Sequence, residues 1–126
     1  MSDKPVLAIV GSRKLEGHPD LETTIALILD AYDPSKVVSG GAPGVDTAAV
    51  RVAKSWGIPT DEKKPQPTKA GKAEYRRSCF ARNTLIAQAA DVVVGIMLPG
   101  GTGGTMDTIR KAERLGKQVQ SVFLDP

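Results

Sequence analysis

Many of the 13 glycines of this chain gather in three short stretches whose residue types suit phosphate binding. The stretches read VGSR at 10–13, SGGAPG at 39–44 and LPGGTGG at 98–104, and a segment with helical periodicity follows each one. Glycine has no Cβ, so it adopts positive φ at little cost and lets a ligand approach the backbone. The first turn of a helix presents unpaired N–H groups and a partial positive charge. We therefore predict an anion site, typically for a phosphate group, at these turns.

The candidate ligand-binding residues share a position in or beside the three turns. Several of them also have an ordinary structural interpretation. Ser39 could cap a turn, Asp46 could interact with the helix dipole, and Thr105 could be the N-cap of the last helix. The predicted ligand-binding residues are Gly11, Ser12, Arg13, Ser39, Gly40, Gly41, Gly44, Asp46, Asn83, Pro99, Gly100, Gly101, Thr102, Gly103, Gly104 and Thr105.

Several familiar sites are missing from the sequence. It contains no G-x-x-x-x-G-K-[ST] motif and no G-x-G-x-x-G after the first apolar run, which excludes a Walker A site and the usual dinucleotide fingerprint. His18 is the single histidine and belongs to no cluster, so we predict no metal and no cofactor. Cys79, the single cysteine, is expected to be a small packed residue and not a nucleophile.

Composition points to one globular domain over residues 1–126, with 40% hydrophobic and 25% charged residues. One cysteine and no apolar run long enough for a signal peptide or a bilayer span favour the cytoplasm and argue against a membrane protein. A net charge of +3 is mild, so nucleic acid is not the expected partner. The basic stretch from Lys63 to Arg77 is either a solvated loop or a lid over a phosphate.

Short apolar runs alternate with amphipathic segments along the chain. This order predicts an α/β fold with a Rossmann-like open parallel sheet of about five strands and helices on both faces. Trp56 ends a core stripe and is expected to be buried. Ligands of such sheets bind beyond the carboxyl ends of the strands, where all three glycine turns would lie. We expect strands at 5–11, 36–40, 58–63, 91–98 and 117–124, helices at 21–32, 43–57, 78–90 and 105–116, and a loop at 64–77.

Four motifs carry a resemblance to a known superfamily. GSR, VVSGGAPGVDTAA, ARNTLIAQAADVVVGI and PGGTGGT, followed by an amphipathic helix, resemble the SLOG superfamily over almost the whole chain. This group includes the LOG-type nucleotide phosphoribohydrolases, the Rossmann-like domain of DNA-processing protein A, and small stand-alone proteins. Its LOG-like members build their pocket across a dimer interface, so the resemblance implies a homo-oligomer.

The LOG resemblance also implies a reaction, the hydrolysis of the N-glycosidic bond of a nucleoside 5′-monophosphate. Arg82 matches the catalytic arginine of that family and would clamp phosphate or ribose hydroxyls. Asp107 is the nearest match to its catalytic glutamate and would activate water or stabilise an oxocarbenium-like transition state. The glycine loop is one residue longer here, however, and aspartate is one methylene shorter than glutamate. Each residue also has a simpler interpretation, Asp107 as a carboxylate in a helix's first turn and Arg82 as a surface helix residue.

These observations lead to three hypotheses for the function. The first is a binding module for a nucleotide or an ADP-ribose-like phosphate ligand, which acts as sensor, carrier or sink. The second is a phosphoribohydrolase of the LOG type. The third, single-stranded DNA binding, ranks last because aromatic residues, which stack on bases, are only 4% of the chain.

Overall fold

A computed structural model describes residues 4–65, 71–101 and 103–126 of the chain. Within these ranges five strands pair in parallel in the order β3-β2-β1-β4-β5. This arrangement confirms the predicted Rossmann-like parallel sheet. The strands are β1 (Val6–Gly11), β2 (Lys36–Ser39), β3 (Thr60–Glu62), β4 (Val92–Met97) and β5 (Gln118–Phe123).

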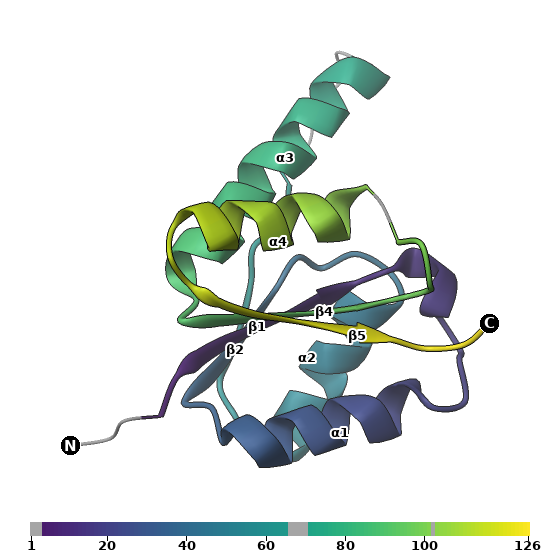
Figure 1. Ribbon diagram of the computed structural model, residues 1–126, viewed down its shortest axis with the longest axis vertical. Coiled ribbons are helices and arrows are strands. Elements are labelled where there is room, and N and C mark those ends of the chain that lie inside the picture. The colour runs from purple at the N-terminus through teal and green to yellow at the C-terminus, as the bar shows by residue number, and fades with distance from the viewer. Residues whose placement is uncertain (1–3, 66–70, 102) are drawn as a thin grey trace.

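Two pairs of helices cover the two faces of the sheet, as Figure 1 shows. One core cluster packs the first pair of helices against one face, and a second cluster packs the later pair against the other. Each layer buries one set of alternating strand residues, as a parallel sheet covered on both faces requires. The helices are α1 (Leu21–Tyr32), α2 (Val45–Ser55), α3 (Lys72–Ala89) and α4 (Gly104–Arg114), and a short 3-10 helix, η1 (Arg13–Leu15), follows β1.

The central strands bring the glycine turns to one edge of the sheet. All six residues of β4 are buried, and β1 lies between β4 and β2. Because every strand is parallel, the segments that follow β1, β2 and β4 emerge at the same edge. The change of direction in strand order between β1 and β4 marks the place where such sheets bind ligands.

Two predictions about local structure are wrong. Helix α3 begins at Lys72, six residues before its predicted start at position 78, so residues 72–77 are helical and not loop. These first turns are exposed on every side, so they lack the apolar period that predicts a buried helix. Trp56 is 47% exposed because α2 ends at Ser55 and the tryptophan is its C-cap.

The outer half of α3 extends beyond the body of the molecule (Figure 1). We call residues 72–80 the α3 arm. No residue of the arm is buried, although its continuation contains the buried Arg82, Asn83 and Ile86. Of the helices in the described ranges, none is long and apolar enough to cross a membrane.

Candidate functional site

A cavity of about 1040 Å³ lies at the carboxyl ends of β1 and β4, and one face of α3 forms its outer wall. This is the edge of the sheet at which the sequence predicts a ligand site. The predicted residues that line the cavity are Gly11, Ser12, Arg13, Asp46, Arg82, Asn83, Pro99, Gly100, Gly101, Gly103, Gly104 and Thr105.

The turn after β1 forms one side of the cavity. The backbone N–H of Ser12 donates to the carbonyl of Ile96 across 3.1 Å, which fixes the end of β1 to β4. The Ser12 hydroxyl accepts a bond from the N–H of Lys14 at 3.1 Å and so caps η1. Arg13 and Lys14 are exposed and line the cavity. This side therefore combines a fixed backbone with positive charge.

The glycine loop after β4 forms the opposite side. Gly100 and Gly103 both have φ of +77°, and a Cβ at either position would meet no atom within 4 Å. Gly103 is the N-cap of α4, so the expectation that Thr105 is the N-cap is wrong, and Thr105 lies inside the first turn. Because α4 starts beside the cavity, its unpaired N–H groups and partial positive charge lie at this wall. Thr102 lies outside the described residues.

Gly95 explains how α4 comes so close to the sheet. A Cβ on this glycine would lie 2.6 Å from Cδ1 of Ile109 and 3.1 Å from Cγ2 of Thr105. No larger residue fits under α4 at this point of β4. The close packing holds the first turn of α4 against the cavity edge.

A buried carboxylate links the turn after β1 to the turn after β2. Asp46 is 4% exposed, and its oxygens accept bonds from the N–H groups of Gly11 and Ala42, each at 3.2 Å. Burial raises the pKa of this carboxyl to about 6, although those N–H groups and the positive charge of Arg82 act in the opposite direction. Asp46 thus occupies two backbone donors that could otherwise bind a ligand anion.

Arg82 and Asn83 form the floor of the cavity below the arm. Arg82 is 9% exposed; its Nη1 donates to the carbonyl of Gly40 and its Nε donates to Oδ1 of Asn83 at 2.9 Å. The amide of Asn83 donates to the carbonyl of Gly104 at 3.3 Å. Arg82 is therefore not a surface residue, and its planar guanidinium is held in place at the cavity wall.

Asp107 is placed differently from the other predicted residues. It does not line the cavity. Its carboxylate accepts from Nδ2 of Asn83 at 3.1 Å and lies 2.8 Å from Nζ of Lys111. The Lys111 ammonium also donates to the carbonyl of Phe80 at 2.7 Å. These contacts join α3 to α4, and the catalytic role of Asp107 stays a prediction.

The predicted residues of the turn after β2 lie behind the cavity and do not line it. Ser39 is fully buried and its hydroxyl donates to the carbonyl of Asp46 at 3.2 Å. A Cβ at Gly40 would collide with Arg82, and one at Gly44 would lie 2.6 Å from the carbonyl oxygen of Ser12. Gly41 faces the side chains of Lys64 and Glu62. This turn supports the cavity wall, and only Ala42 from it reaches the cavity.

The outer wall comes from one face of α3. Of its residues, the sequence predicts only Asn83 as a ligand contact, and it places Lys72 and Arg76 in the basic stretch that could cover a phosphate. The wall residues follow helical spacing along this face of the helix, which brings side chains three or four residues apart together. This stripe mixes lysine, tyrosine, arginine and cysteine, so a search for apolar periodicity does not detect it. Its members are Lys72, Tyr75, Arg76, Cys79, Phe80, Asn83 and Ile86.

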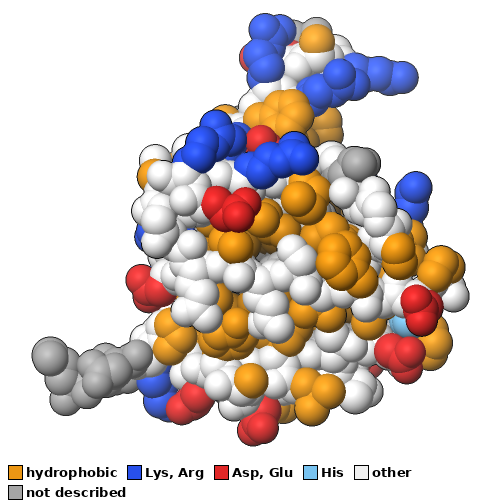
Figure 2. All heavy atoms as spheres, in the orientation of Figure 1, with side chains coloured by type: hydrophobic (Ala, Val, Ile, Leu, Met, Phe, Trp, Pro, Cys, Tyr) orange, Lys and Arg blue, Asp and Glu red, His pale blue; other side chains and the backbone are white. Residues whose placement is uncertain are grey.

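Positive charge gathers around the mouth of the cavity. Figure 2 shows Lys and Arg side chains over α3 and α4, with hydrophobic groups between them. Within the basic stretch, Lys63 and Lys64 pair with acidic neighbours in β3, whereas Lys72 and Arg76 line the cavity. In the part of the chain that the structure describes, no three His, Cys, Asp or Glu side chains are placed to hold a metal ion.

Comparison with known proteins confirms the fold and no more. No family model matches the chain, and no curated protein matches it. Among solved structures, the chain is similar to DNA processing protein A (DprA) from Streptococcus pneumoniae, with a TM-score of 0.69 and 23% sequence identity. The match covers 93% of this chain and 50% of DprA, so the chain spans about half the length of that protein. The match therefore supports the Rossmann-like parallel fold, and the resemblance to the SLOG superfamily stays a prediction.

Proposed function

We propose that the protein binds a nucleotide or a nucleotide-derived phosphate, such as an ADP-ribose-like molecule, in the cavity at the sheet edge. The observation that supports this proposal best is the convergence of two glycine turns and the start of α4 on one cavity. In the proposal residues 1–126 act as one cytoplasmic domain and serve as a sensor, carrier or sink.

The phosphate is assigned to the wall formed by Gly100, Gly101, Gly103 and the first turn of α4, which begins at Gly104. Backbone N–H groups at a helix start bind phosphate oxygens, and the helix dipole favours the negative charge. Arg13 and Lys14 add positive charge from the opposite rim. The N–H groups of Gly11 and Ala42 are excluded from this role, because the Asp46 carboxylate already accepts from both.

Binding without catalysis is the first choice because of the position of Asp107. A general base must lie within hydrogen-bond reach of the water or group that it activates. Asp107 instead contacts Asn83 and Lys111 between α3 and α4. The second candidate is a LOG-type phosphoribohydrolase, which the buried Arg82 at the cavity wall favours.

Gly104→Leu tests the binding proposal with little backbone strain. Gly104 lies in α4, and a Cβ there would meet only Nδ2 of Asn83, at the ordinary distance of 3.8 Å. Leucine at this position would project into the cavity and cover the proposed phosphate site. We expect adenosine 5′-monophosphate or ADP-ribose to raise the melting temperature of the wild type and not that of this variant. Ala31→Leu, at an exposed position of α1, is the matched control and should respond like the wild type.

The outcomes separate the candidate functions. If no nucleotide or ADP-ribose-like compound shifts the wild-type melting temperature, the binding proposal is wrong. Release of free base from a nucleoside monophosphate by the wild type, and not by Arg82→Lys, would replace it with the hydrolase. Sedimentation of the wild type tests the proposed homo-oligomer.

A further inference from the structure

We propose that Tyr75 on the α3 arm is the residue that recognises the base of the bound nucleotide, by stacking against it. This inference rests on the proposed function and adds a base-binding residue to the proposed phosphate site. It assigns the ligand to the nucleoside phosphates, and not to sugar phosphates or inorganic phosphate.

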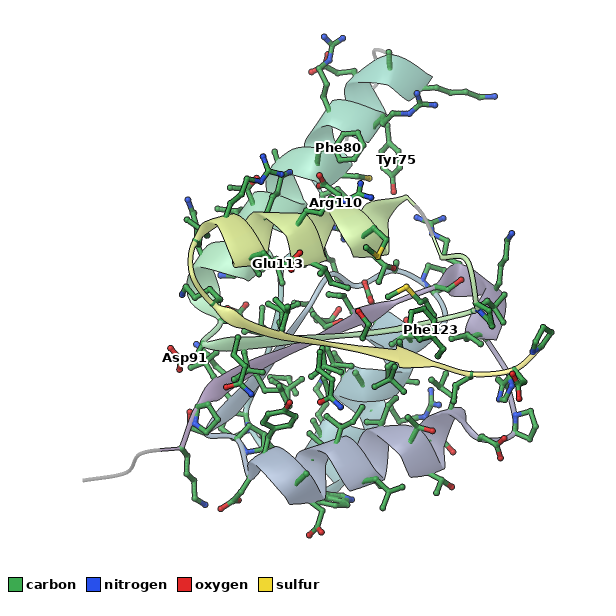
Figure 3. All side chains as sticks on the ribbon, in the orientation of Figure 1. Tyr75, Phe80, Asp91, Arg110, Glu113 and Phe123 are labelled. Carbon is green, nitrogen blue, oxygen red and sulfur yellow. The ribbon has the colours of Figure 1, made fainter. Side chains whose placement is uncertain are left out.

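Tyr75 lines the cavity although it is 43% exposed and belongs to no core cluster. Figure 3 shows its ring on the side of α3 that faces the start of α4. Because the Tyr75 ring is exposed at the cavity wall and is part of neither core cluster, it can offer a face to a planar ligand. Stacking between a base and an aromatic side chain is a strong, sequence-tolerant contact.

The length of the α3 wall suits a ligand with two separated ends. Asn83 lies at the buried floor beside Gly104, and Tyr75 lies eight residues further out, a rise of about 12 Å along the helix axis. In a nucleoside phosphate the ribose separates the phosphate from the base, which provides the required extension.

Contacts with α4 fix the helix that carries the ring. Lys111 donates to the carbonyl of Phe80 at 2.7 Å, and its ammonium lies 5.5 Å from the centre of the Phe80 ring. The first residues of the arm therefore project from a point anchored to α4. Arg76, next to Tyr75 on the cavity face, adds positive charge, whereas Arg77 pairs with Glu74 and does not line the cavity.

Two ligands that differ only in the base provide the test. Binding of adenosine 5′-monophosphate and of ribose 5-phosphate is measured by calorimetry on the wild type, Tyr75→Ala and Tyr75→Phe. We expect Tyr75→Ala to weaken the nucleotide by about 5- to 150-fold and to leave ribose 5-phosphate within about twofold. Tyr75→Phe keeps a stacking face and should retain the affinity for both. Trp56→Ala removes an equally exposed aromatic residue that does not line the cavity and should change neither.

The outcomes distinguish this inference from the proposed function. If ribose 5-phosphate binds the wild type and Tyr75→Ala weakens both ligands equally or neither, the base assignment is wrong and the phosphate site stands. If neither ligand binds the wild type, both proposals are wrong. A single-stranded oligonucleotide that binds more tightly than the mononucleotide and loses affinity in Tyr75→Ala would assign the ring to nucleic acid and overturn the inference.

Discussion

Asp46 and Arg82 enclose the same backbone position from two sides. A Cβ at Gly40 would lie 2.7 Å from Oδ2 of Asp46 and 2.5 Å from Nη1 of Arg82. Only glycine, which has no Cβ, leaves room at this position for both the Asp46 carboxylate and the Arg82 guanidinium. Their electrostatic interaction makes the first two predictions possible.

The unfolding free energy should depend on pH through Asp46. Its pKa is about 6 in the folded protein against 3.8 for the unfolded chain, so the folded state binds the proton more tightly. The stabilisation is complete below pH 3.8 and is lost as pH rises through 6. We expect wild-type stability relative to Asp46→Asn to fall by about 3 kcal/mol between pH 3.5 and 7. Urea unfolding of both proteins across this range measures the difference, and a flat difference would contradict the burial of this carboxyl.

Removal of the Arg82 charge should raise the pKa of Asp46 further. The positive charge of Arg82 lowers that pKa in the native protein, against the larger effect of burial. In Arg82→Gln the carboxyl should therefore titrate above pH 6, as followed by its carbon-13 chemical shift. Arg82→Lys keeps a positive charge and should leave the midpoint closer to that of the wild type. An unchanged midpoint in Arg82→Gln would show that the two groups do not interact.

Gly11→Ala should be much more destabilising than Gly57→Ala. A Cβ at Gly11 would collide with the carbonyl oxygen of Ile96 and lie 2.6 Å from Cγ2 of Val45, which cannot move freely. We expect a loss of about 3 kcal/mol in unfolding free energy. Gly57 has φ of +75° and open space around it, so alanine there should cost only about 1–2 kcal/mol. Equal losses in urea unfolding would indicate that β1 and β4 separate to accept the methyl group.

The Asp107–Lys111 pair should contribute measurably to stability. Both side chains are about four-fifths buried, at 22% and 21% exposure, which reduces solvent screening. A double-mutant cycle with Asp107→Asn and Lys111→Met should give a coupling energy of about 1 kcal/mol. The Arg51–Glu22 pair, with both side chains about 60% exposed, is the control and should give a smaller value. The reverse order would mean that the lower exposure of the Asp107–Lys111 pair does not strengthen it.

The sheet was predictable from sequence because its strands are short apolar runs that alternate with amphipathic helices. The strands β1 to β5 and three of the helices lie within a few residues of their predicted ranges. The start of α3 was not predictable from periodicity, because the arm buries nothing. Trp56 satisfied the apolar pattern, but a pattern does not say where the helix stops.

The site was predictable in part. Glycine turns can be recognised in sequence because positive φ and close approach require glycine, and those after β1 and β4 line the cavity. That the turn after β2 packs behind them depends on the side chains of Asp46 and Arg82, whose positions no spacing rule specifies. For Gly101, positive φ is not the reason that glycine is required. Gly101 is not among the positive-φ residues, and a side chain there would instead meet Sδ of Met97 at 2.5 Å.

On the α3 arm, the residues that line the cavity are different from the residues that stabilise the fold. Its cavity-facing side chains contribute no core contacts, so their replacement costs the body of the molecule little folding energy. New selectivity could therefore evolve, or be engineered, by exchange of the outer two helical turns on an unchanged scaffold. A library randomised at Lys72, Tyr75 and Arg76 would test this expectation without a change to the core.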